Sequence, residues 1–209
     1  MANAQQTIFN FPSADVMDNG KVYVELDAAF KTNDQEVLRR FSSFVPRVVV
    51  GSGGNVEVGL NVTGNINPGA DSTAIVPTIK WRFYQNEKNK LGLFAGTNFY
   101  IPVRNRSYNF GCYSYAAVGK TIGKTRLTAG GFVASRNVFA PGASRSGGQF
   151  AVERTINNKM AVAADWLTGK HASGYFTPGS IYSDGLCFVF YRQRGRRERK
   201  SLFPFRARL

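Results

Sequence analysis

The 209-residue chain contains no run of 18 apolar residues, which excludes a membrane-spanning helix but not membrane-spanning strands, whose apolar residues alternate with polar ones. It has one histidine and two cysteines. Neither Cys112 nor Cys187 has a second Cys or His at ligand spacing, so no metal site or disulfide framework is predicted. No glycine pair opens a helix as a phosphate-binding loop does. We therefore expect no metal and no cofactor.

Acidic residues are also scarce, with 13 Asp and Glu against 27 Lys and Arg, for a net charge of +14. Half of this excess lies in the last 18 residues, where eight basic residues oppose only Glu198 and leave +7. The remaining positive charge is spread along the chain. Because it forms no continuous basic stripe, we expect no nucleic-acid partner.

Short polar turns recur every 34 or 35 residues, centred on Gly54, Lys88, Gly123 and Asn158. Between successive turns lie two stretches of about ten residues that alternate apolar and polar, joined by a longer segment rich in Gly, Pro, Asn, Ser and Arg. Alternation at period two is typical of β-strands. The pattern predicts an all-β fold, an antiparallel up-and-down transmembrane β-barrel of about 10–12 strands, with short turns on one side and long loops on the other.

The composition of the polar face favours a membrane barrel over a soluble one. In a soluble barrel the apolar face is the core, and the solvated face should be rich in Lys, Glu and Thr. Here the polar face is rich in Gly and Ala, with charges of both signs that can neutralise one another in a narrow interior. The residues expected to face the lumen are Glu25, Asp27, Glu57, Lys80, Arg82, Arg126, Glu153 and Asp165.

Three details complete the strand assignment. Residues 180–191 are expected to form the last regular strand. Pro46 and Pro77 remove ladder donors, so bulges or strand ends are expected there. Aromatic residues gather near predicted strand ends, as an interfacial girdle requires: these are Phe30, Trp81, Phe83, Phe99, Tyr108, Phe110, Phe150 and Trp166.

The chain divides into three parts. Residues 1–20 form an N-terminal segment in which Ala2-Asn3-Ala4 has the small-x-small form of a signal-peptidase site, either a signal-peptide remnant or an ordinary terminus. Residues 21–191 form the barrel. Residues 192–209 form a basic tail with three competing explanations: a polyanion-binding tail, a turn leading into a short strand at 203–209, or an out-of-frame terminus. The third is favoured, because the tail loses both the turn chemistry and the period of the barrel.

The chain resembles bacterial outer-membrane β-barrel proteins of the small, porin-like kind, which are functionally uncharacterised. The resemblance covers roughly residues 7–183 and is carried by stretches such as Thr7–Pro12, Asn98–Arg106 and Gly169–Gly179. It implies a bacterial outer-membrane location, contact with outer-membrane lipid and insertion by the barrel assembly machinery, and it brings no catalytic motif. The departure is the C-terminus, which lacks the terminal aromatic residue usual in such barrels.

Basic residues in the long connections would face lipopolysaccharide phosphates, which arginine pairs bidentately, although they serve loop solubility equally well. These residues are Arg104, Arg106, Arg136, Arg145 and Lys170.

The leading functional hypothesis is a passive pore or a structural membrane protein that is not an enzyme. A second hypothesis is an outer-membrane lipid hydrolase with Ser173 as nucleophile and His171 as base, oriented by Asp165 or Asp184. A third is a soluble β-barrel that binds polyanions through its basic tail. The sequence leaves the permeant solute and the oligomeric state open.

Overall fold

The protein is all-β over the part of the chain that the structure describes, and no described helix is long and apolar enough to cross a membrane. The computed structural model describes Ile8 and the ranges 11–31, 42–63, 73–103, 110–139, 142–171, 175–184, 186–191, 194–195 and 202–208.

Ten strands follow one another in an antiparallel up-and-down sheet, each paired with its sequence neighbours. Short turns at 54–55, 87–90, 123–124 and 156–159 join alternate strand pairs, and Gly54 and Asn55 adopt the positive φ that a tight hairpin requires. The strands are β1 (Val22–Lys31), β2 (Ser42–Gly53), β3 (Val56–Thr63), β4 (Ala74–Asn86), β5 (Leu91–Pro102), β6 (Gly111–Ile122), β7 (Thr125–Ala134), β8 (Ser146–Thr155), β9 (Met160–Leu167) and β10 (Tyr175–Asp184).

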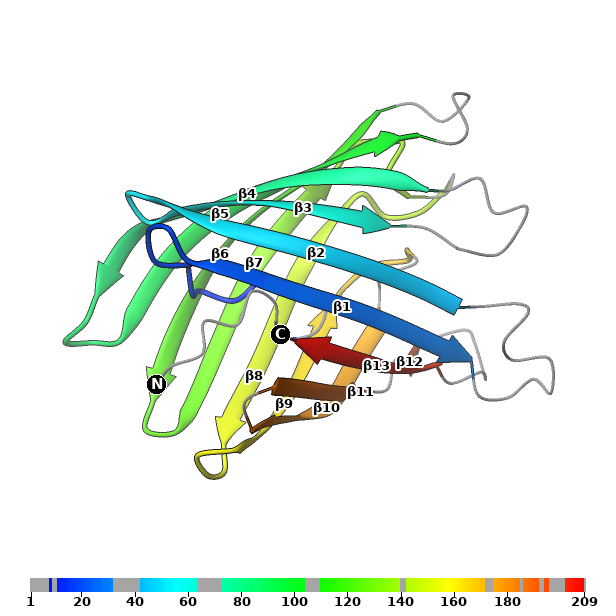
Figure 1. Ribbon diagram of the computed structural model, residues 1–209. Helices are drawn as coiled ribbons and strands as arrows, with labels where there is room; N and C mark the ends of the chain where they lie inside the picture. Colours follow the sequence, from blue (N-terminus) through cyan, green and yellow to red (C-terminus); the bar gives the residue numbers. More distant parts are fainter. Residues whose placement is uncertain are drawn as a thin grey trace.

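Three further strands lie beyond β10: β11 (Leu186–Tyr191), β12 (Arg194–Gly195) and β13 (Leu202–Arg208). β11 pairs with both β10 and β13, and β13 also pairs with β1. In Figure 1 the sheet curls until β13, in red, lies beside β1, in blue. The expected single strand over 180–191 is therefore two strands, and residues 202–208 lie within the sheet instead of in a separate tail.

The predicted irregularities at Pro46 and Pro77 occur on one side of each strand: the β2–β3 ladder ends at Arg47, beside Pro46, and the β4–β5 ladder is interrupted between Ile75 and Thr78, at Pro77. Pro46 pairs with Leu26 and Pro77 with Leu60, both in continuous register. The register shifts lie elsewhere, at Gly51–Gly53 in β2 and at Trp81–Tyr84 in β4. Each proline therefore keeps its register with one neighbouring strand and lacks a ladder partner in the other.

The N-terminal segment at 11–20, with Ile8, lies against the inner face of the curved sheet. Ile8 and Phe11 are completely buried and belong to the hydrophobic cluster of the protein. The segment joins the sheet at Gly51, where Gly20 N donates to Gly51 O at 2.9 Å and Gly51 N donates to Lys21 O at 3.0 Å. The core of the protein thus lies on the concave side of the sheet.

Candidate functional site: a polar interior filled by the N-terminal segment

Apolar and charged side chains occupy opposite faces of the sheet, in the reverse of the usual arrangement. On β4, Ile79 and Trp81 are 42% and 52% exposed, whereas Lys80 between them is 4% exposed. On β3, Val58 is 43% exposed and its neighbour Glu57 is 2% exposed. We call the face with Lys80 and Glu57 the inner face and the face with Val58 and Ile79 the outer face. A water-soluble protein does the opposite: it buries apolar residues such as Val58 and Ile79 and exposes charged residues such as Lys80 and Glu57.

The buried charges on the inner face form ion pairs across neighbouring strands. Lys80 Nζ lies 2.7 Å from Glu57 Oε1. Arg126 Nη2 lies 3.0 Å from Glu153 Oε2, and the two side chains are 16% and 14% exposed. Because an isolated buried charge is costly, each pair stabilises the face only while both partners are present.

Arg47 supplies a third cation on the inner face. Its Nη1 lies 3.3 Å from Glu25 Oε1, its Nη2 lies 3.9 Å from Asp27 Oδ2, and its Nε donates to Asn61 Oδ1 at 3.1 Å. Arg82, also on the inner face, donates from Nη2 to Asn55 Oδ1 at 2.9 Å. The inner face therefore carries the eight charged residues expected to line it, with Arg47 added.

These inner-face charges also hold the N-terminal segment. Phe11 N donates to Asp165 Oδ2 at 3.0 Å, and Met17 N donates to Glu57 Oε2 at 2.8 Å. Lys80 Nζ donates to Ser13 O at 3.2 Å. These three contacts are made to the backbone of the segment, so they satisfy polar groups that would otherwise be buried without partners.

One side-chain pair adds to the backbone contacts. Arg126 forms an ion pair with Asp15 of the segment while it holds Glu153 on β8. A single guanidinium therefore links the segment to the wall of the sheet. Its planar fork of five donors suits two carboxylates at once.

Small residues on the inner face make room for the segment. A Cβ placed on Gly92 would lie 3.8 Å from the Cβ of Ala14, and a Cβ on Gly119 would lie only 2.7 Å from it. A Cβ on Gly51 would collide with the backbone carbonyl of Asp18. Gly119 and Gly51 therefore leave space that the N-terminal segment occupies, and at Gly92 the segment passes at an ordinary van der Waals distance.

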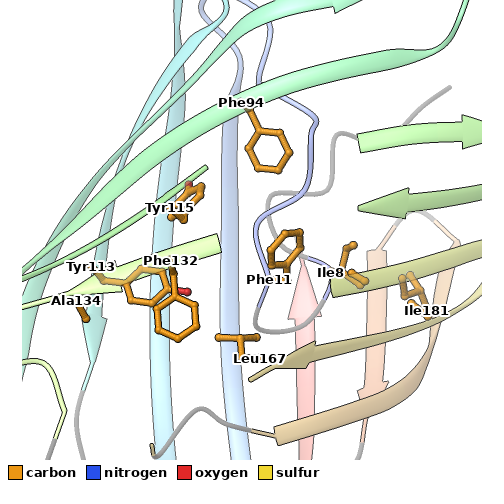
Figure 2. Packing of buried hydrophobic residues seen from close by; sticks show 11 residues of the cluster. Ile8, Phe11, Phe94, Tyr113, Tyr115, Phe132, Ala134, Leu167 and Ile181 are labelled. Carbon is orange, nitrogen blue, oxygen red and sulfur yellow. The ribbon is translucent and has the colours of Figure 1, made fainter. Parts of the chain in front are cut away.

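Apolar packing completes the interior. Figure 2 shows Ile8 and Phe11 among Phe94, Leu167 and Ile181, with side chains pointing toward one another. Towards the long connections an aromatic group forms from β6, β7 and two loops. Tyr113 stacks on Phe132 with ring centroids 5.2 Å apart. The members of this group are Tyr113, Tyr115, Phe132, Phe139 and His171.

His171 is packed as an aromatic residue. Its ring stacks on Phe139 with centroids 4.5 Å apart, and its Nε2 lies 2.9 Å from Thr168 O. The predicted nucleophile Ser173 and the side chain of Asp184 lie outside the described residues. Asp165, the other candidate to orient His171, accepts a hydrogen bond from Phe11 N.

Three of the five predicted loop cations are described. Arg136, Arg145 and Lys170 are exposed, on the connections that follow β7 and β9. These two connections meet where Ser144 N donates to Lys170 O at 3.0 Å. Arg104 and Arg106 lie outside the described residues.

Two parts of this interior were not predicted from the sequence: Arg47 and the segment with Asp15. Arg47 alternates with Val48 and could have been assigned by period, but Pro46 obscured the pattern. The segment at 11–18 has no strand period. Its local signal is a group of apolar residues outside any predicted strand, with Ile8, Phe9 and Phe11 just before or at its start.

Among the described residues, no group of three His, Cys, Asp or Glu side chains could hold a metal ion. No protein-family model and no curated protein matches the sequence, so its function is inferred from the chain's own residues.

Proposed function

We propose that this protein is a β-barrel of the bacterial outer membrane, closed through β11 and β13. The pairings β10–β11, β11–β13 and β13–β1 return the sheet to its first strand. A closed sheet leaves no unpaired edge, which is the condition for strands to lie in lipid. Both ends of such a barrel fall on the short-turn side, as in bacterial outer-membrane proteins.

The observation that carries the proposal is the reversal of the two faces. Each large apolar side chain left in water forfeits roughly 1.5–3 kcal/mol of burial energy. The outer face exposes such residues on every strand from β1 to β10 for which side chains are described, including Val24, Val48, Leu60 and Val162. In lipid the same face is favourable, and the charged inner face is kept away from hydrocarbon.

Aromatic pairs on the outer face support two interfacial belts. Trp81 and Phe83, with ring centroids 5.6 Å apart, lie towards the short-turn end of β4. Phe99 and Phe110, stacked with centroids 6.0 Å apart, lie towards the long-loop end of β5 and β6. Aromatic residues at both boundaries of an apolar band are typical of outer-membrane barrels.

The filled interior favours a closed pore over an open one. The N-terminal segment and the aromatic group occupy the space through which a solute would pass. We therefore propose a barrel that does not conduct while the segment is bound, and that acts as a structural membrane protein or as a pore opened by the segment's release. Outer-membrane lipid and the barrel assembly machinery are its proposed partners, and we propose no catalytic activity.

Insertion is tested with refolded protein and lipid vesicles. The protein should float with the vesicles and should migrate differently on a gel before and after heating, as folded membrane barrels do. A protein that remains monomeric and folded in buffer without lipid or detergent would contradict the proposal.

Occlusion is tested with a disulfide between Ala14→Cys and Gly92→Cys, in a background with Cys112→Ser and Cys187→Ser. The 3.8 Å separation of the two Cβ positions matches the usual Cβ–Cβ distance of a disulfide. In planar bilayers the oxidised protein should not conduct. Openings that appear only after reduction would identify a gated pore, and silence in both states would identify a structural barrel. Equal conductance in both states would show that the segment does not close the barrel.

A further inference from the structure

An apolar groove lies on the outer face over β6 to β10. It has a volume of about 540 Å³, and nearly all of its lining is apolar. Two of the residues that line it are small: Ala129 on β7 and Ala164 on β9. Larger side chains stand beside them: Phe150 pairs with Trp166, and Trp166 pairs with Phe176, in one row across three strands.

One cationic side chain, that of Lys120, lines the groove. Lys120 lies at the short-turn end of β6, where it pairs with Leu127 of β7. Among the side chains of β1 to β10 that the structure describes, Lys120 and Arg154 are the only Lys, Arg, Asp or Glu residues on the outer face, and both are exposed. The rest of this face is apolar or uncharged. Both lie within two residues of the short-turn ends of their strands, at the border of the apolar band, where a long cationic side chain can reach lipid head groups.

The turns beside the groove continue the positive charge. Lys124 and Lys159 are exposed on the two short turns that join β6 to β7 and β8 to β9. Between Glu87 and Asp184 the sequence has only two acids, Glu153 and Asp165, and both are on the inner face.

The other short turns carry no larger charge. The turn at 54–55 has no charged residue, and the turn at 87–90, with Glu87 beside Lys88 and Lys90, has the same net charge of +1 as each turn beside the groove. What distinguishes β6–β9 is that Lys120 and Arg154 lie on the outer face close to these turns, so that four cations gather at the short-turn end of the groove.

We propose that this groove is a binding site for one anionic glycerophospholipid of the leaflet that the short turns face. An acyl chain lies over Ala129 and Ala164 against the row of aromatic rings, and the phosphate is held by Lys120 with Arg154. Long cationic side chains at the end of an apolar band extend towards head groups, which suits them to a lipid phosphate. The site rests on the proposed membrane location.

The two tryptophans of the chain provide the test, because Trp166 lies in the groove and Trp81 lies on the outer face of β4. Trp81→Phe leaves Trp166 as the only reporter, and Trp166→Phe leaves Trp81 as the matched control. Each variant is refolded into mixed phosphatidylglycerol and phosphatidylcholine vesicles in which one lipid or the other has brominated acyl chains, at the same mole fraction. Bromine quenches tryptophan fluorescence only at contact.

Trp166 should be quenched more by brominated phosphatidylglycerol than by brominated phosphatidylcholine, whereas Trp81 should be quenched equally by both. One cation near a membrane surface contributes about fivefold to the affinity for an anionic head group, so Lys120→Gln should reduce the preference at Trp166 by about that factor. Arg154→Gln should reduce it in the same direction and serves as an independent variant.

The outcomes separate the two proposals. Equal quenching of Trp166 by both lipids, or the same preference at Trp81, would overturn the local lipid site while leaving the membrane barrel intact. If neither tryptophan is quenched by either brominated lipid, the membrane location itself is wrong.

Discussion

Gly119 is the position where the placement of the N-terminal segment can be measured most sharply. A Cβ at Gly119 would lie 2.7 Å from the Cβ of Ala14, well inside the usual separation of about 3.5–4.0 Å between contacting carbon atoms. The segment cannot move aside freely, because Asp15 is held by Arg126 and Ser13 O by Lys80. Gly119→Ala should therefore behave as overpacking, at a cost of about 1–3 kcal/mol.

Without that collision the same substitution should be favourable, since alanine in a strand is better than glycine by roughly 0.5–1 kcal/mol. Gly131→Ala on the outer face is the matched control, because its Cβ would meet no atom closer than 3.5 Å. Ala14→Gly removes the opposing methyl group and should restore most of the stability lost in Gly119→Ala.

The assay is equilibrium unfolding of all four proteins of the cycle in detergent or vesicles. The two sites should couple by about 1–2 kcal/mol, within the range found for residues in contact. Additive effects, or a Gly119→Ala variant as stable as Gly131→Ala, would show that Ala14 does not pack on β6.

Three further predictions concern the sheet that forms the wall of the proposed barrel. Val58→Arg on the outer face should lower the free energy of unfolding in vesicles by roughly 2–4 kcal/mol, whereas Ser52→Arg near the turn should lower it by about 0–1 kcal/mol. Equal losses of stability would contradict the assignment of Val58 to the lipid-facing side of β3. Lys80→Met leaves the Glu57 carboxylate buried without its cation and should lower the free energy of unfolding by about 3–5 kcal/mol. Adding Glu57→Gln should recover most of that loss, and a double variant as unstable as the single one would contradict the ion pair's role. Deleting residues 202–209 removes a strand paired on both sides and should lower the melting temperature by many degrees, and an unchanged melting temperature would show that β13 adds nothing.

The regular part of this fold is readable from the sequence because its signals are local. The turns at Gly54, Lys88, Gly123 and Asn158 mark hairpins whose chemistry lies within a few residues, and the resulting order from β1 to β10 matches the up-and-down pairing of the sheet. Period-two alternation in the same strands also assigned Glu57 and Lys80 to one face.

The parts that the sequence did not reveal depend on contacts between distant residues. The segment at 11–18 is positioned by Asp165, Lys80 and Arg126, which are far along the chain and carry no local mark of that role. β13 alternates apolar residues with Arg206 and Arg208, but Pro204 interrupts the pattern and no turn chemistry precedes it, so a short strand was only one of three explanations for this part of the sequence. It is a strand in the structure because β1 and β11 supply hydrogen-bonding partners on both sides.

The central claim is that the apolar face of the sheet meets lipid while the charged face surrounds the N-terminal segment. It is tested most directly by single nitroxide labels at successive positions of β3, from Val56 to Thr63, in vesicle-refolded protein lacking Cys112 and Cys187. Collision rates with oxygen, which concentrates in lipid, should alternate at period two, high at Val58, Leu60 and Val62 and low at the residues between them. A flat profile, or maxima at Glu57 and Asn61, would contradict the account.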